Sequence, residues 1–239
     1  MVQSKDYIIP KGKWRFNEDV AKVFTDMLER SIPNYETMRQ LTYLLARNFI
    51  VNGTCIVDMG CSNGLSAEKI MSHVNDCKIF LFDKSEPMLT ECRKKYQSQL
   101  DTGHLFIENR DAVDDWGLDN RCSLIQSILT LQFIPKDKRE EVINHVYNSL
   151  LPGGAFFLVE KVKCSGDALE KVISSEYYEM KHNHAYTKEQ IAEKRKSLKG
   201  VLEPLQVWQN FSMLRKAGFT EVETYWRYLN FVGILAVKR

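Results

Sequence analysis

The sequence is poor in glycine and proline and almost balanced in charge. Twelve glycines and 6 prolines among 239 residues are too few for a flexible linker or a fibrous repeat. The 33 Lys and Arg residues and 31 Asp and Glu residues leave a net charge of +2, which excludes an acidic tail protein and gives no basic signature of nucleic-acid binding. With 44% hydrophobic residues and so little net charge, intrinsic disorder is excluded too.

Neither the cysteine spacing nor the hydrophobic runs indicate a metal site or a membrane segment. No two of the 6 cysteines are spaced as Cys-x-x-Cys and none lies near paired histidines, so we expect no metal site. Scattered cysteines are typical of reduced thiols. The first residues carry no apolar signal-peptide core, and no run reaches the roughly 18 apolar residues of a membrane span. These absences predict a cytoplasmic protein with no membrane partner.

Hydrophobic spacing predicts how the chain is organised. Positions 20, 23, 24, 27 and 28 are apolar at helical intervals, Asn17 is a candidate N-cap and Pro33 a candidate stop, and a second helix is expected at about 35–49. From residue 51, short apolar strands alternate with helices, the first of these helices at 65–74, which predicts a parallel sheet covered on both faces. A charged, tyrosine-rich helical segment interrupts this alternation before the last helix and strands. We predict one domain over residues 1–239, with a helical cap (1–50), a cofactor-binding core (51–163), a helical insertion (164–205) and a closing helix and strands (206–239).

A glycine-rich turn, Val-Asp-Met-Gly-Cys-Ser-Asn-Gly at 57–64, follows the first expected strand. Glycines at the carboxyl end of a strand let a ligand approach the backbone, and a helix start behind them offers N–H groups. The third glycine of the NAD-binding pattern is missing, which weakens a dinucleotide interpretation. Asp83 ends the next strand, where a carboxylate can accept hydrogen bonds from ribose hydroxyls, and Asp111 follows the third strand, where it can meet an adenine amino group.

These landmarks, followed by Leu-Pro-Gly-Gly at 151–154, occur in the order found in the Rossmann-like superfamily of S-adenosylmethionine (SAM)-dependent methyltransferases. Within it, the chain resembles the carboxy-SAM synthase family from about Lys13 to the C-terminus. The resemblance rests on the segment Trp14–Tyr35, on Leu129–Phe133, and on His182, Tyr186, Glu189, Ile191, Lys194 and Arg195 in the insertion. It implies a Rossmann-like α/β fold with a mostly parallel seven-stranded sheet and helices on both faces.

The resemblance also implies an activity. Members of this family convert SAM and prephenate to carboxy-SAM and phenylpyruvate, and the product serves a partner enzyme that modifies wobble uridine in tRNA. It thus implies SAM or carboxy-SAM as the bound cofactor, prephenate as the substrate and a homodimer. Direct tRNA binding is not expected, because glutamates interleave the basic cluster at 194–199.

Carried over position by position, the resemblance implies a set of ligand-binding residues. Tyr35 would contact the methionine end of the cofactor, and the backbone of the glycine turn would line it. The full set is Tyr35, Asp58, Gly60, Cys61, Ser62, Gly64, Asp83, Lys84, Asp111, Ala112, Ile128 and Arg195. Arg195 is expected to act in the chemistry, because a planar guanidinium can form a bidentate pair with the carboxylate carried by the sulfonium methylene.

Two residues depart from the family pattern. Ile128 stands where the family carries Asn, so one polar contact to the cofactor is either absent or supplied by Gln126 or Ser127. Lys84 stands where Asn is frequent, and either interacts with the ribose or faces water.

Two other functions remain open at this point. One is an ordinary SAM-dependent methyltransferase acting on a small molecule or RNA, from which Arg195 would distinguish a synthase. The other is a non-catalytic SAM-fold subunit, against which the intact Gly60, Gly64 and Asp83 argue.

Overall fold

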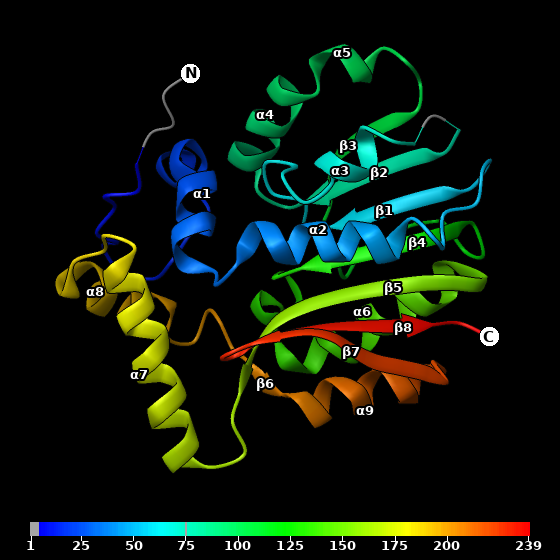
Figure 1. The fold of residues 1–239 in the computed structure, drawn as a ribbon. Coiled ribbons are helices and arrows are strands. Elements are labelled where there is room, and N and C mark those ends of the chain that lie inside the picture. Colours follow the sequence, from blue (N-terminus) through cyan, green and yellow to red (C-terminus); the bar gives the residue numbers. More distant parts are fainter. Residues whose placement is uncertain (1–4, 75) are drawn as a thin grey trace.

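The computed structural model describes residues 5–74 and 76–239 (Figure 1). The strands are β1 (Cys55–Met59), β2 (Lys78–Asp83), β3 (Leu105–Asn109), β4 (Cys122–Ile128), β5 (Leu150–Lys163), β6 (Leu205–Gln206), β7 (Glu221–Tyr228) and β8 (Phe231–Val237). The α-helices are α1 (Glu18–Ser31), α2 (Tyr35–Ala46), α3 (Glu68–Met71), α4 (Glu86–Lys95), α5 (Gln97–Leu100), α6 (Lys136–Ser149), α7 (Asp167–Asn183), α8 (Lys188–Leu198) and α9 (Val207–Ala217). A short 3-10 helix covers Leu131–Phe133.

The strands form one mostly parallel sheet with the order β3-β2-β1-β4-β5-β8-β7. β8 runs antiparallel to both β5 and β7, and the short β6 pairs beside β5 as an eighth strand that the sequence did not predict. The strand order reverses between β1 and β4, because the chain returns from the β3 edge to the middle of the sheet. In open α/β sheets, ligands bind at such a switch point, outside the carboxyl ends of the strands.

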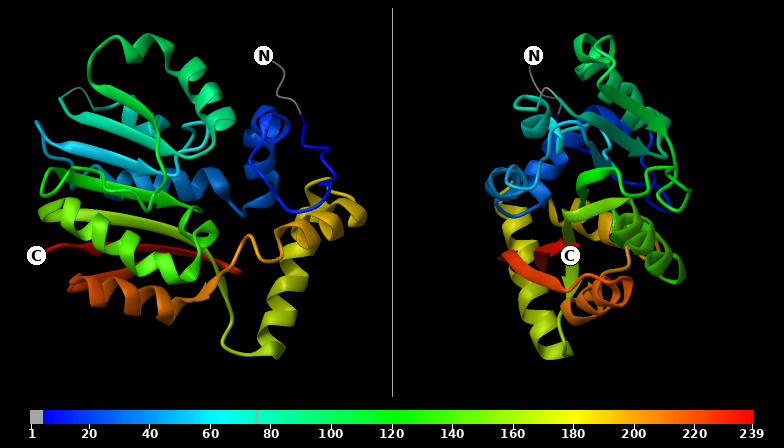
Figure 2. Two further views of the ribbon diagram at one scale, coloured as in Figure 1. Left: turned by 180° about the vertical axis from the view of Figure 1, so that it is seen from behind. Right: turned by 90° about the vertical axis from the view of Figure 1, so that its right-hand side faces the viewer.

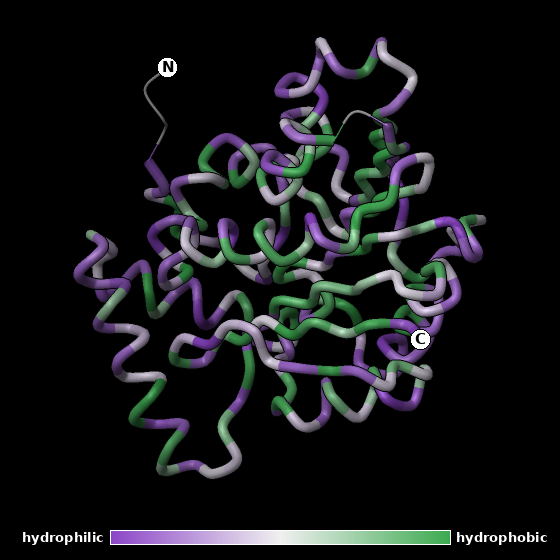
Figure 3. Tube along the Cα trace, turned by 45° about the vertical axis from the view of Figure 1, so that its right-hand side comes forward, coloured by the Kyte–Doolittle hydropathy of each residue, from purple (hydrophilic) through white to green (hydrophobic). Residues whose placement is uncertain are grey.

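Alternating strand residues supply two hydrophobic cores, one on each face of the sheet. Phe156 and Leu158 of β5 pack with α6 and α9, whereas Ala155 and Phe157 pack with α2, α3 and α4. The view from behind shows α6 and α9 in front of the sheet (Figure 2). The central strands are accordingly hydrophobic along most of their length, while α7 alternates between hydrophobic and hydrophilic residues (Figure 3). Helices cover both faces of the sheet, as the strand composition predicts.

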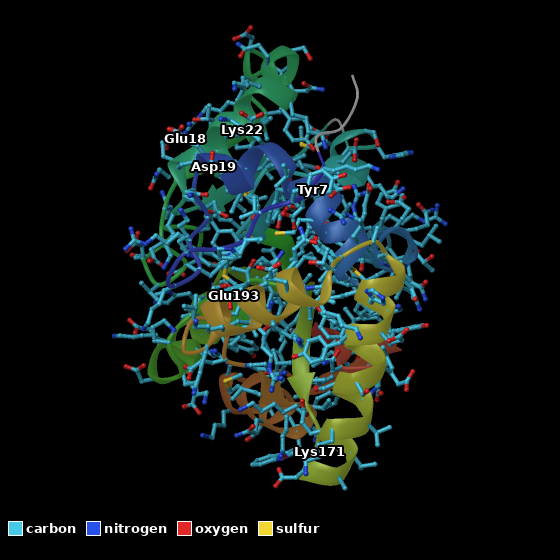
Figure 4. The ribbon with its side chains drawn as sticks, turned by 90° about the vertical axis from the view of Figure 1, so that its left-hand side faces the viewer. Tyr7, Glu18, Asp19, Lys22, Lys171 and Glu193 are labelled. Atoms are coloured by element: carbon cyan, nitrogen blue, oxygen red, sulfur yellow. The ribbon has the colours of Figure 1, made fainter. Side chains whose placement is uncertain are left out.

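The helices α1, α7 and α8 lie beyond the carboxyl ends of the parallel strands (Figures 1 and 2). Figure 4 faces this side, where the exposed side chains of Glu18 on α1 and Lys171 on α7 point outward. The buried Asp6 joins these elements: its carboxylate accepts a hydrogen bond of 2.6 Å from the Tyr186 hydroxyl and lies 3.4 Å from the Lys194 ammonium. These contacts connect the N-terminal segment to the α7–α8 hairpin beyond the carboxyl ends of the parallel strands.

Most expected elements are present, with Asn17 capping α1 through the Val20 N–H, and two details differ. The helix expected at 65–74 is only α3, because the Arg39 guanidinium binds the Leu65 carbonyl and Ser72 and His73 bind the Lys69 carbonyl. The Leu-Pro-Gly-Gly turn is incorporated into the long β5. Residues 1–4 of the expected cap lie outside the described residues. Within the described ranges, no helix combines the length and the apolar character needed to cross a membrane.

Candidate functional site

The glycine turn after β1 brings the backbone close to its neighbours. Gly60 has φ 75°, and a Cβ added there would overlap the Thr130 side chain, whose hydroxyl donates a 3.2 Å hydrogen bond to the Gly60 carbonyl. Gly64 also has φ 75°, and an added Cβ would lie 2.5 Å from the Tyr96 ring. A side chain at either position would be strained and would collide. The turn therefore requires glycine for backbone conformation and for space.

Asp83, at the end of β2, is held toward this turn by backbone donors. Its Oδ2 accepts a hydrogen bond of 2.9 Å from the Ser62 N–H, and its Oδ1 accepts one of 2.8 Å from the Ser85 N–H. Burial raises the pKa of Asp83 and the two N–H groups lower it. A carboxylate has about four acceptor sites, so each oxygen keeps capacity for a ribose hydroxyl.

Asp111 and Lys84 stand beside Asp83 at the same edge. The Lys84 ammonium lies 3.4 Å from the Asp111 carboxylate, while 65% of its side chain stays exposed. Lys84 therefore faces water and pairs with Asp111. Asp111 and Ala112 are partly buried where the chain leaves β3.

Asp58, on the adjacent β1, is a buried carboxylate with both oxygens free of any hydrogen-bond partner among the described residues. Burial is the largest cause that raises the pKa of Asp58 to about 7, while the adjacent Gln126 side chain lowers this pKa and the neighbouring Asp83 raises it. An unpartnered buried carboxylate is costly, so it marks a place for a cationic or hydrogen-donating group. Tyr35, at the start of α2, is also buried, and burial raises the pKa of its hydroxyl to about 12.

One cavity of about 200 Å³ joins these elements at the carboxyl ends of the strands. The predicted residues that line it are Tyr35, Gly60, Cys61, Ser62, Asp83, Lys84, Asp111, Ala112 and Ile128. Asp58 and Gly64 lie behind this lining. Gln126, an alternative to the missing Asn contact, borders a smaller neighbouring cavity, and its Nε2 atom has no partner in the described structure. The Ser127 hydroxyl is buried and likewise unpartnered there, whereas Ile128 contributes only apolar surface to the main cavity.

Arg195 is not among the lining residues. Its side chain on α8 is exposed, and its guanidinium carbon lies 5.6 Å from the centre of the Tyr178 ring. It is still close enough to Lys161 to lower the pKa of that ammonium. The structure thus places Arg195 beside the cavity, with its guanidinium outside it.

Three lysines line the cavity that the sequence did not identify as ligand-binding: Lys161 from β5, Lys181 from α7 and Lys194 from α8. Lys161 could have been predicted from the sequence, because it is a charged residue near the carboxyl end of a strand, as Asp58 and Asp83 are. For Lys181, the signal was its position four residues after Tyr177, on the same face of a helix. These cations make the α7–α8 end of the cavity positive.

The comparisons with known proteins agree with this geometry. Residues 56–154 match a family model described as a methyltransferase domain. A carboxy-S-adenosyl-L-methionine synthase from Methylococcus capsulatus is 35% identical, and the match covers 99% of this chain and 97% of the relative. One from Staphylococcus epidermidis is also 35% identical, over 95% of this chain and 97% of the relative. The chain belongs to the carboxy-SAM synthase family.

Solved structures support the same fold at lower similarity. A putative SAM-dependent methyltransferase from Methanococcus maripaludis superposes with a TM-score of 0.63 at 17% identity, covering 96% of each chain. Human N-acetylserotonin methyltransferase, solved in complex with SAM, gives 0.60 at 16% identity, covering 92% of this chain and 55% of that one. The fold is the Rossmann-like SAM-methyltransferase fold, and the protein is a SAM-dependent transferase.

The residues of the site fit SAM, which this enzyme family uses. The unpartnered Asp58 carboxylate suits the α-ammonium group, the glycine turn leaves space for the methionine chain, and the remaining acceptor sites of Asp83 suit the ribose. Over the part of the chain that the structure describes, no group of three or more His, Cys, Asp and Glu side chains could hold a metal ion.

Proposed function

We propose that the protein is a carboxy-SAM synthase that converts SAM and prephenate to carboxy-SAM and phenylpyruvate. When bound, SAM supplies the sulfonium methyl group that becomes carboxylated. The ring carboxylate of prephenate leaves as carbon dioxide and is captured at that methyl carbon. The ring hydroxyl leaves with the methyl proton as water, and the ring becomes aromatic.

The length of chain over which the synthase relatives match supports this proposal. The methyltransferase model covers residues 56–154, whereas the synthase relative matches over 99% of the chain, which includes the N-terminal cap and α7–α8. Those two regions both line the cavity, and Asp6 joins them through Tyr186 and Lys194. A reactive carbanion on the methyl group would be protonated by water, so the reaction needs the closed, largely apolar space that Trp14, Phe16 and Phe24 help to line.

In this proposal Arg195 binds the carboxylate that carboxy-SAM has gained. Because the guanidinium is exposed on α8, it reaches such a carboxylate only if α8 moves toward the cavity or a second copy presents it. We also propose a homodimer. α7 and α9 expose the large apolar side chains of Leu169, Val172 and Trp208, at 58%, 61% and 64% of their surface, which a second copy could cover. Light scattering of the purified protein tests this assembly.

The proposed product feeds tRNA modification at wobble uridine through a partner enzyme, and the reaction would take place in the cytoplasm. The decisive experiment incubates the purified protein with SAM and prephenate labelled with carbon-13 in the ring carboxylate. Mass spectrometry should show a nucleoside heavier than SAM by one labelled CO2. If SAM remains unmodified while an added acceptor becomes methylated, the protein is an ordinary methyltransferase.

A further inference from the structure

Two of the cavity lysines form no direct ion pair within the described residues. Lys181 is 5% exposed and Lys161 is partly buried, and neither ammonium group forms an ion pair or hydrogen bond there. Lys194 differs, because its ammonium lies 3.4 Å from the Asp6 carboxylate. Arg30 is likewise paired, at 2.7 Å from Asp26. Glu170 raises the pKa of Lys161 and Asp6 that of Lys181, but neither carboxylate forms a direct ion pair with them, so among the described residues both ammonium groups are open to an anionic ligand.

Aromatic rings hold these two ammonium groups in place. The Lys161 Nζ lies 4.2 Å from the centre of the Tyr177 ring, and the Lys181 Nζ lies 5.9 Å from the same ring and 4.7 Å from that of Tyr186. Such contacts orient a cation without neutralising it. Burial is the largest cause that lowers the pKa of Lys161 to about 8 and that of Lys181 to about 7, and each lysine would be fully charged only with an anion beside it.

The position of the pair separates it from the cofactor. The residues that suit the methionine end of SAM are Asp58 on β1 and Gly60 just after it, whereas Lys161 lies near the end of β5, two strands further along the sheet. Neighbouring strands are about 4.8 Å apart, so the two places are roughly 10 Å apart. That separation leaves room for the reacting methyl group and a second substrate between them.

We propose that Lys161 and Lys181 form a subsite for the carboxylate of a 2-oxo acid side chain, the group that prephenate carries and phenylpyruvate retains. This inference rests on the proposed function for the identity of the substrate. The carboxylate that leaves as carbon dioxide does not suit this subsite, because a close cation pair would stabilise it in the ground state. A retained carboxylate gains binding energy there without opposing the reaction.

The test measures binding of phenylpyruvate to the full chain saturated with S-adenosylhomocysteine, which has no methyl group to react. Lys181→Met and Lys161→Met remove the charge and keep a long apolar side chain. Each should weaken phenylpyruvate binding roughly ten- to a hundredfold, the range for a charge-assisted hydrogen bond. Lys181→Arg should restore much of the affinity, and Lys196→Met, whose side chain is 79% exposed on α8, is the matched control.

Two further ligands decide what the lysines recognise. Benzyl methyl ketone has the phenylpyruvate skeleton without its carboxylate, so the Met variants should bind it as the unchanged protein does. SAM affinity should stay within about twofold, since the cofactor lies elsewhere in the cavity. Equal losses for SAM and phenylpyruvate would overturn the subsite and assign the lysines to the cofactor. Equal losses for the ketone and the acid would reduce them to packing residues.

This result is separable from the proposed function. If the unchanged protein forms carboxy-SAM but the Met variants bind phenylpyruvate normally, the subsite is wrong and the synthase proposal stands. If no carboxy-SAM forms but phenylpyruvate binding depends on both lysines, the subsite stands and the reaction is wrong. Should Lys181→Met fail to fold by circular dichroism, Lys161→Met and Lys181→Arg still decide the question.

Discussion

At the cofactor end of the cavity, donors of the chain already hold the Asp83 carboxylate and the glycine turn, while at the α7–α8 end two lysines have no ion pair among the described residues. Asp83 already accepts N–H groups from Ser62 and Ser85, and the Gly60 carbonyl accepts the Thr130 hydroxyl. Lys161 and Lys181 have aromatic rings beside them but no carboxylate in direct contact among the described residues. The cofactor end is therefore preorganised for its ligand, whereas the α7–α8 end needs an anionic ligand to pair with its lysines.

The two ends also differ in how the chain builds them. The cofactor end uses residues that follow consecutive strands, so local sequence largely determines it. The other end depends on pairs far apart in the chain, as between Asp6 and Tyr186 or between Asp6 and Lys194. Substitutions at the two ends of the cavity should therefore impair different properties of the protein.

The largest effect is expected at the glycine turn. Gly60→Ala places a side chain at φ 75° and against Thr130, so strain and overlap together should cost roughly 2–5 kcal/mol of folding stability. SAM binding should be lost with it. Gly103→Ala is a matched control, because Gly103 has φ 74° but nothing within 4 Å of the added Cβ. Thermal unfolding of both variants measures the difference, and similar melting temperatures would rule out the overlap with Thr130.

Removal of the ribose partner should have the next largest effect. Asp83→Ala takes away the carboxylate at the end of β2, and two charge-assisted hydrogen bonds of about 1.5–3 kcal/mol each are at stake. We expect SAM affinity to fall roughly ten- to a hundredfold or more. Calorimetric titration measures this, with Asp101→Ala, at an exposed carboxylate outside the cavity lining, as the control. An unchanged dissociation constant would remove Asp83 from the site.

A smaller and selective effect is expected on α8. Arg195→Leu should weaken carboxy-SAM binding about tenfold, because one charge-assisted pair is lost, and leave SAM binding within about twofold. Titration of both ligands against both proteins checks the selectivity. Repetition at protein concentrations above and below dimer dissociation shows whether a second copy supplies the guanidinium. Equal losses for the two ligands would contradict carboxylate recognition by Arg195.

Most residues predicted for the cofactor end line one cavity, because the sequence signals for them are local. Gly60 and Asp83 stand at fixed positions after short apolar strands, and the alternation of strands and helices determines the order of the sheet. The same reasoning assigned too long a helix after the turn, because it could not foresee that Arg39 from α2 binds the Leu65 carbonyl. Tertiary contact overrode local propensity at that point.

The α7–α8 end was harder to predict for the opposite reason. Lys181 and Lys194 resemble ordinary surface lysines in a charged helical segment, and only the fold turns them inward. Arg195, the neighbour of Lys194 and the residue favoured by the resemblance, points to solvent in this structure. Adjacent helical residues lie about 100° apart around the axis, so a one-residue difference decides which side chain enters the cavity.

The smallest effect concerns the pH dependence of cofactor binding through Asp58. Its pKa of about 7 lies above the ordinary value of 3.8 because its carboxyl is buried without a partner. Ionisation therefore opposes folding of the free protein, whose stability should decline as the pH rises from about 4 to about 7. A cofactor ammonium reverses the sign, since it binds the ionised form.

SAM affinity should thus be highest above pH 7 and should fall as the pH drops through 7, by about tenfold at most between pH 8 and pH 6 as the ionised fraction shrinks. Asp58→Asn should flatten this profile at the lower affinity and stabilise the free protein at pH 8. Asp101→Asn, at an exposed carboxylate, should keep the slope. If the affinity of Asp58→Asn for SAM still depends steeply on pH, another group is responsible for the pH dependence. Asp83, whose pKa is also raised by burial, would be the first to examine.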